Sequence, residues 1–175
     1  MTRTRLDILG TSCSLDDALA LFDALDAVRA EEITGRWRGR ELRTGHPMDG
    51  ALEASGWYGK QFDGVDDVHP LLFRTPGGQL VSLDPRRVPL GLADQLPRGA
   101  MSAARRTLGI TRVAMATRKP RARLRNVEFR GVVTAAMVYD HLPIIDVFRR
   151  VDADTLLGVM DLRDSAPYVF VLERD

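Results

Sequence analysis

The stretch Gly35-Arg36-Trp37-Arg38-Gly39 decides how this chain is expected to fold. Side chains of a strand alternate between its two faces, so both glycines share one face with Trp37 while the two arginines share the other. Glycine lets a strand bend at the closed end of a small barrel, and one large ring fills the space that the glycines leave. The stretch therefore predicts a small antiparallel barrel with Trp37 plugging its base.

The composition is that of a globular protein with a full core. The chain has 175 residues, of which 45% are hydrophobic and 28% charged, and this suits one domain over residues 1–175. Its net charge of +1 gives no overall attraction to nucleic acid or to an anionic membrane. Lys60 and Lys119 are the two lysines among 25 basic residues, a bias that we attribute to a GC-rich genome. We find neither a secretory signal nor a membrane span, and we expect a soluble cytoplasmic protein.

The N-terminal half combines helical and strand patterns. Ser14 and Asp17 form a capping-box pattern before apolar residues at helical spacing, which predicts a helix that covers the barrel. Residues 51–62 are expected to form a short, glycine-interrupted helix. Residues 68–74 and 79–83 flank a turn of Thr, Pro, Gly and Gly, so they predict a hairpin.

The C-terminal third is strongly β in pattern. Five apolar runs are separated by short turn-like segments and cover residues 121–129, 131–139, 143–151, 155–162 and 168–174. Connections this short predict an up-and-down meander. With the three earlier strands the total is about eight, the number at which a barrel holds one small ligand. Between the two halves, residues 88–120 predict a helical or irregular cover.

Three longer segments carry a resemblance to a known family. They are GRWRGRELRTGHPMDGALEASGWYGKQF, TAAMVYDHLPIIDVFRRVD and LLGVMD. Together they resemble the bacterial GXWXG-motif family, in which the motif portion, here residues 31–87, is joined to a C-terminal domain of unknown function, here the meander of residues 121–175. The resemblance implies a mainly β, calycin-like barrel of the lipocalin type with an N-terminal helix. It also implies fatty acid or phospholipid binding, with no established enzymatic reaction.

The resemblance further implies how the base of the barrel is closed. In lipocalin-like barrels the tryptophan of the motif is usually covered by an arginine on the last strand, and Arg174 is the candidate by position. Gly35, Trp37, Gly39 and Arg174 are therefore expected to be structural. A stacked guanidinium and indole contribute about 0.5–2 kcal/mol to stability.

Alternation along the C-terminal strands suggests the lining of the barrel. The expected ligand-contacting residues on these strands are Met137, Tyr139, Met160, Tyr168 and Phe170. Methionine is flexible and repacks around ligands of varied shape. The same side chains can also fill a dry core, and this alternative stays open.

Two polar residues are further candidates for the ligand site. If Asp146 points inward, its carboxyl group must be paired or protonated, and it can then bind a ligand hydroxyl or act as an acid or base. The alternative is that Asp146 faces solvent or pairs with a neighbouring arginine. His46 lies in a turn and either contacts ligand at the barrel mouth or caps backbone groups. An enzyme using Asp146, Tyr139 or His46 is the second functional hypothesis, an isomerase, cyclase or hydrolase acting on an apolar metabolite.

Several classes of site lack a signal in the sequence. Three scattered histidines and one cysteine argue against a metal site, and no nucleotide loop or Gly-x-Ser-x-Gly elbow is present. We therefore expect no metal and no cofactor. The basic residues from Arg118 to Arg125 alternate with apolar ones, as on the wet side of an outer strand, so we expect no nucleic-acid partner. A homodimer stays open.

Overall fold

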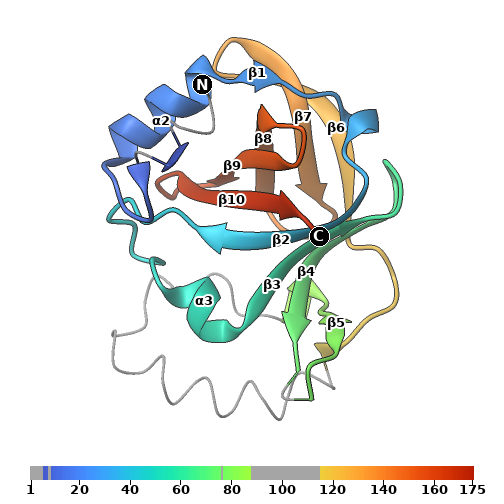
Figure 1. Cartoon of the computed structure of the whole chain (residues 1–175). Helices are drawn as coiled ribbons and strands as arrows, with labels where there is room; N and C mark the ends of the chain where they lie inside the picture. The colour runs from blue at the N-terminus through green and yellow to red at the C-terminus, as the bar shows by residue number, and fades with distance from the viewer. Residues whose placement is uncertain (1–5, 8, 76, 88–114) are drawn as a thin grey trace.

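The fold is a closed antiparallel barrel with helices outside it (Figure 1). The computed structural model describes residues 6–7, 9–75, 77–87 and 115–175. The helices are α2 (Leu15–Ala24), α3 (Ala51–Ser55) and the 3-10 turns Ala30–Glu32 and Pro85–Arg87. The strands are β1 (Asp26–Ala27), β2 (Gly35–Glu41), β3 (Trp57–Phe62), β4 (Val68–Arg74), β5 (Leu80–Ser82), β6 (Ala122–Phe129), β7 (Val132–Tyr139), β8 (Ile144–Asp152), β9 (Thr155–Leu162) and β10 (Tyr168–Arg174).

Eight of these strands form the ring. Their order is β2, β3, β4, β6, β7, β8, β9 and β10, and β10 pairs with β2 to close it. The closure depends on one short junction, since β4 and β6 meet through the single pair Val68 and Ala122. Strands β6 to β10 follow one another as a meander, as the sequence predicts, and the expected barrel of about eight strands is confirmed. The ring contains β3 in place of the strand expected at residues 79–83, because β5 pairs only with β4 and lies off the ring.

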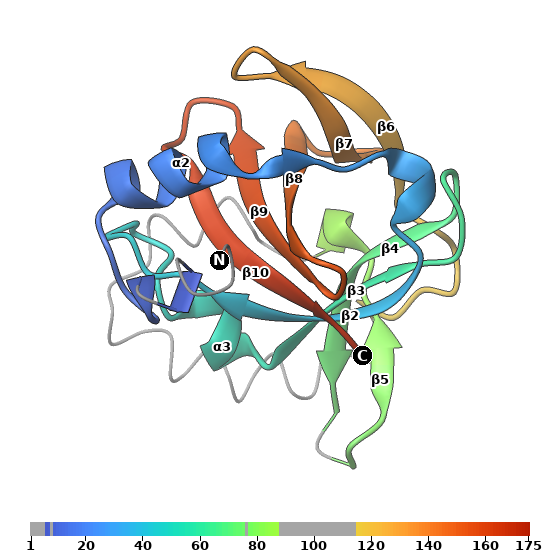
Figure 2. The same cartoon turned by 45° about the horizontal axis from the view of Figure 1, so that its top comes forward.

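Helix α2 covers the outer face of the later strands (Figure 2). Ser14 caps it by accepting a hydrogen bond from the backbone N–H of Asp17 at 3.0 Å. Its apolar side, with Phe22 fully buried, packs against outward-facing residues of β8, β9 and β10 such as Val147 and Val169. These strands are therefore buried on both faces, one toward the barrel interior and one toward α2.

One sequence expectation about the motif half is wrong. Residues 51–62 do not form a single interrupted helix, because α3 ends at Ser55 and β3 begins at Trp57. Gly56 lies between them with φ at 74°, the left-handed conformation that ends helices. The expected hairpin of β4 and β5 is present, while most of the expected cover, residues 88–114, lies outside the described residues.

The base of the barrel is closed around Trp37. The ring is 1% exposed, and the guanidinium carbon of Arg174 lies 4.3 Å from its centroid. Both side chains also donate to the carbonyl oxygen of Thr34, the indole N–H at 3.0 Å and Arg174 at 2.9 Å. One backbone oxygen thus holds the plug and its cover together.

Candidate functional site

A cavity lies inside the barrel, and one of its lining residues, Lys60, pairs with Trp37 between β3 and β2. On β10, Tyr168 and Phe170 line the cavity, while Arg174 covers Trp37 six residues further along than Tyr168. Six residues of strand span roughly 20 Å, so the Tyr168 side of the cavity lies well away from the plug. The cavity has a volume of about 30 Å³ and is lined by Met48, Leu52, Trp57, Lys60, Leu71, Tyr139, Ile144, Asp146, Met160, Leu162, Tyr168 and Phe170.

A buried ion pair is the main polar feature of this cavity. The Lys60 ammonium lies 2.7 Å from Oδ2 of Asp146, and the two side chains are only 3% and 2% exposed. Lys60 also donates to the carbonyl oxygen of Pro70 at 3.3 Å. Burial raises the pKa of Asp146 above its ordinary value, and the charge and hydrogen bond of Lys60 oppose that rise.

Three aromatic rings surround the Lys60 ammonium. Its nitrogen lies 5.2 Å from the centroid of Phe170, 5.7 Å from Trp57 and 5.8 Å from Tyr139. The faces of aromatic rings attract cations, and the attraction is stronger where water is excluded. The rings and Asp146 together stabilise a positive charge inside an apolar barrel.

Trp57 and Lys60 both reach this cavity because β3 is irregular. Trp57 and Lys60 are three residues apart, so regular alternation would put them on opposite faces. The pairing of β3 with β4 shifts on each side of Gly59, whose φ is 153°. This bulge reverses the alternation between residues 57 and 60. A side chain at residue 59 would meet the backbone oxygen of Trp37 at 1.9 Å, so glycine is required there.

The structure decides which face of β8 points inward. Ile144, Asp146 and Phe148 face the barrel interior, where Asp146 meets Lys60. The neighbouring Arg149 points to the outer face, where its guanidinium lies 5.2 Å from the ring of Phe22. Asp146 is therefore neither solvent-facing nor paired with an arginine, and the pairing partner is a residue that sequence reasoning did not select.

Five of the seven expected ligand residues line the cavity. These are Tyr139, Asp146, Met160, Tyr168 and Phe170. Met137 does not line it, although it is fully buried in the same core. Burial raises the pKa of Tyr139 well above its ordinary value, with the Asp146 charge acting in the same direction. The pKa of Tyr168 is raised by burial and by the charge of Glu41. Both phenols therefore keep their protons at neutral pH.

His46 holds backbone groups and does not line the cavity. Its Nδ1 accepts from the backbone N–H of Met48 at 3.1 Å, and its Nε2 lies 3.2 Å from the carbonyl oxygen of Ala166. A nitrogen that accepts on one side leaves the proton on the other, so both nitrogens are engaged. The ring packs edge-on against Tyr168, with centroids 5.2 Å apart. His46 thus packs against Tyr168, which lines the cavity, without lining the cavity itself.

Glu41 holds α3 beside the cavity. Its carboxylate is 2% exposed and accepts from the backbone N–H groups of Gly50 at 2.6 Å, Leu52 at 2.7 Å and Glu53 at 3.2 Å. These are first-turn N–H groups without partners inside the helix. Glu41 therefore places Leu52 at the cavity, a role that only the tertiary structure reveals.

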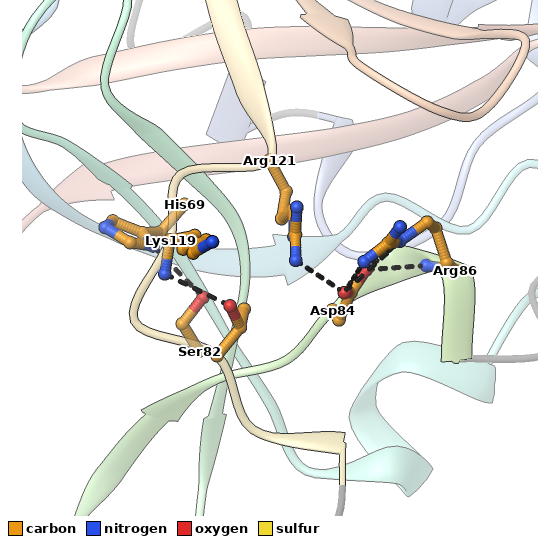
Figure 3. A network of polar contacts seen from close by, with 7 residues as sticks. His69, Ser82, Asp84, Arg86, Lys119 and Arg121 are labelled. Carbon is orange, nitrogen blue, oxygen red and sulfur yellow. Dashed lines mark hydrogen bonds and ion pairs between the residues drawn. The ribbon is translucent and has the colours of Figure 1, made fainter.

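A second polar cluster lies near β4 and β5, away from the Lys60–Asp146 pair (Figure 3). Asp84 accepts from Arg86 and Arg121 at 2.7 and 2.8 Å, and the hydrogen bond from Arg86 is the main reason that its pKa falls to about 2. Nearby, Nδ1 of His69 lies 3.2 Å from the Ser82 hydroxyl. Backbone bonds join this region to residues 115–117. These contacts hold the segment before β6 against the segment that follows β5.

Among residues 6–7, 9–75, 77–87 and 115–175, we find no group of three or more His, Cys, Asp or Glu side chains arranged to hold a metal ion. No helix within these residues combines the length and apolar character needed to cross a membrane. The arginines of the basic run near β6 pair with carboxylates, Arg123 with Asp140 and Arg125 with Asp66.

Comparison with known proteins places the chain in a family. Residues 20–78 match the GXWXG protein family, and residues 120–174 match a domain of unknown function, DUF4334. A crystal structure of a protein from Thermomonospora curvata is 32% identical, with a TM-score of 0.74, and the match covers 99% of this chain and 98% of that one. None of the curated proteins matches the chain. The chain therefore belongs to the GXWXG family that carries this C-terminal domain of unknown function.

Proposed function

We propose that the barrel binds a hydrophobic small molecule, with the polar end of the molecule against Asp146 and Trp57. One observation carries this proposal. Oδ1 of Asp146 and Nε1 of Trp57 are buried without a hydrogen-bond partner among the described residues, and both side chains line the same cavity. Unpaired buried polar atoms cost free energy, and at a cavity they indicate a missing partner. One atom needs a donor and the other an acceptor.

The size of the cavity sets how such a molecule fits. A volume of about 30 Å³ holds roughly one or two water molecules, which is enough for a polar head and too little for an acyl chain. The apolar remainder must displace side chains at the cavity. Met48, Met160 and Leu52 line it and have several rotatable bonds. We infer that these three side chains move when the ligand enters.

Fatty acids and phospholipids suit this arrangement. Their carbonyl oxygens accept a hydrogen bond, as the Trp57 N–H requires, and a carboxylic acid proton or a headgroup hydroxyl is a donor for Asp146. The rest of the molecule is apolar, as are most of the side chains that surround the cavity. The family resemblance points to the same class of ligand.

The experiment is to search the purified protein for lipid and then to fill the cavity. Native mass spectrometry and solvent extraction are expected to find a co-purified apolar molecule, and a fluorescent fatty acid is expected to bind. Met160→Trp fills the cavity and is expected to abolish both signals. Val133→Trp is the matched control, because Val133 is 52% exposed on β7. Absence of ligand and of probe binding in the unmodified protein would contradict the proposal.

A second function is favoured by the position of the Lys60–Asp146 pair. Both groups are nearly inaccessible to water and lie beside the cavity, where an acid and a base can act on a bound apolar molecule. Asp146 and Tyr139 are the candidates for acid–base roles. The test is turnover of a molecule that co-purifies: an isomerase, cyclase or hydrolase predicts conversion that Asp146→Asn abolishes and Asp140→Asn retains.

The cytoplasmic location stays a prediction, and a homodimer stays an open alternative. Fractionation of the source cells measures the location, and light scattering coupled to size-exclusion chromatography measures the oligomeric state. A monomer at all concentrations would exclude the homodimer.

A further inference from the structure

The identity of the buried cation is unusual for this chain. Two of its 25 basic residues are lysines, and one of these two, Lys60, is the cation at the cavity. The other, Lys119, is exposed. Arginine keeps its proton under all ordinary conditions, whereas a lysine can lose its proton and become a nucleophile. The chain therefore uses lysine at the position where its distinct chemistry is available to a ligand.

We propose that Lys60 forms an imine with an apolar aldehyde that enters the cavity. This inference rests on the proposed function, because the aldehyde must first bind in the barrel. It names the substrate class of that site, a hydrophobic molecule with a reactive carbonyl group at its polar end. Lys60 is the nucleophile and Asp146 moves the proton.

The steps balance without any other reactant. Asp146 takes a proton from the Lys60 ammonium across their 2.7 Å contact, leaving a neutral amine and a neutral acid. The amine nitrogen attacks the carbonyl carbon, and a proton moves from nitrogen to oxygen to give a carbinolamine. Asp146 then returns its proton to the hydroxyl group, which leaves as water. The products are a protonated imine on Lys60, a carboxylate on Asp146 and one water molecule, so the net charge is unchanged.

The surroundings of Lys60 suit both the first proton transfer and the protonated imine that the reaction forms. Burial of Asp146 favours its protonated form, which helps it to accept the first proton. The protonated imine carries the same single charge as the ammonium. It is therefore stabilised by the same carboxylate and by the rings of Phe170, Trp57 and Tyr139. The cavity has room for the small reacting group.

The test uses decanal as the probe and sodium cyanoborohydride to trap the imine. The protein carries Lys119→Arg, which leaves Lys60 and the N-terminal amine as its primary amines. Peptide mapping by mass spectrometry is expected to find the reduced adduct on Lys60. The rate is expected to saturate with decanal and to fall when a fluorescent fatty acid occupies the cavity. In urea-unfolded protein, Lys60 is expected to lose this preference over the N-terminal amine.

Two variants separate the roles of the residues. Asp146→Asn, checked for folding by circular dichroism, is expected to slow adduct formation on Lys60 by roughly 10²-fold, the usual scale for a lost acid–base group. Asp140→Asn is the exposed control and is expected to react normally. An unchanged rate in Asp146→Asn would overturn the proton-transfer role.

The outcomes also separate this inference from the proposed function. If the fluorescent fatty acid binds but decanal labels only the N-terminal amine, the imine is overturned and the binding function stands. If neither the fatty acid nor decanal enters the barrel, both are overturned.

Discussion

Gly39 lies directly under the indole of Trp57. A Cβ atom at residue 39 would come within 2.1 Å of the ring, far closer than atoms approach in proteins. The last glycine of the motif is thus needed for a second tryptophan, 18 positions further along the chain. Phe170 packs edge-on against the same indole, with centroids 6.1 Å apart.

Gly39→Ala is expected to lower the free energy of unfolding by about 1–3 kcal/mol, because the added methyl group overpacks the interior. Urea denaturation measures the change. Gly64→Ala is the matched control, since a Cβ there would meet nothing within 4 Å and the φ angle is not in the left-handed region. Equal stability of the Gly39 variant and the unmodified protein would mean that Trp57 moves aside without cost.

Trp37→Ala is expected to cost about 3–5 kcal/mol, as for other large-to-small changes in a core. Arg174→Ala removes the cover from the plug and is expected to cost about 0.5–2 kcal/mol. Urea denaturation followed by circular dichroism measures both. Arg174 also pairs with exposed Asp154, so Asp154→Ala is the control and is expected to change little. Unchanged stability of the Trp37 variant would rule out the plug.

The Lys60–Asp146 pair is expected to behave as one unit. Lys60→Met leaves a buried carboxyl group without its partner and is expected to cost about 3–5 kcal/mol at neutral pH, whereas Lys60→Met with Asp146→Leu is expected to recover much of this loss. A double-mutant cycle measures the coupling. The exposed pair Arg125–Asp66 is the control, with coupling of about 0–1 kcal/mol. Additive losses at Lys60 and Asp146 would contradict the prediction.

The Lys60→Met variant is also expected to respond to pH in a defined direction. Burial raises the pKa of Asp146 in the folded protein, and loss of Lys60 removes the influence that opposes this rise. The folded variant therefore binds the proton more readily than the unfolded chain. Its stability should fall as the pH rises from 3.8, the ordinary value, through the raised pKa of Asp146. Thermal unfolding across this range tests the sign.

Asp84 should show the opposite pH dependence. Its pKa in the folded protein is about 2, against an ordinary value of 3.8, so the unfolded chain takes up the proton first as the pH falls. The stabilisation is complete above pH 3.8 and is lost as the pH falls through 2; it amounts to about 2 kcal/mol. Asp84→Asn should therefore be less stable than the unmodified protein at pH 7, and the two should converge near pH 2. A constant difference between them would refute this.

The fold was largely predictable because its signals are local. The apolar alternation of β6 to β10 and the short turns between them require a meander, and Ser14 marks the start of α2 through a hydrogen bond three residues away. The position of Arg174 over Trp37 follows from the family pattern. The β3 strand was missed because its residues lie next to a helix that ends at a single left-handed glycine.

The site was only partly predictable because two of its determinants are not local. Alternation could not choose the inner face of β8, since α2 buries the outer face as well. Lys60 was missed because its segment was expected to be helical, and because the bulge at Gly59 changes which residues of β3 point inward. The scarcity of lysine in the sequence was the one signal that could have singled it out.

The sequence by itself predicted a barrel of about eight strands around Trp37, since strand alternation, turn residues and the motif glycines act over a few positions, but it did not show that β3 is one of the ring strands. Only the tertiary structure decided that Lys60 and Asp146, 86 residues apart, meet inside it at 2.7 Å. That contact depends on ring closure, which brings β3 and β8 to face one another, and on a bulge that turns Lys60 inward. The chemistry that we propose for the barrel rests on this pairing.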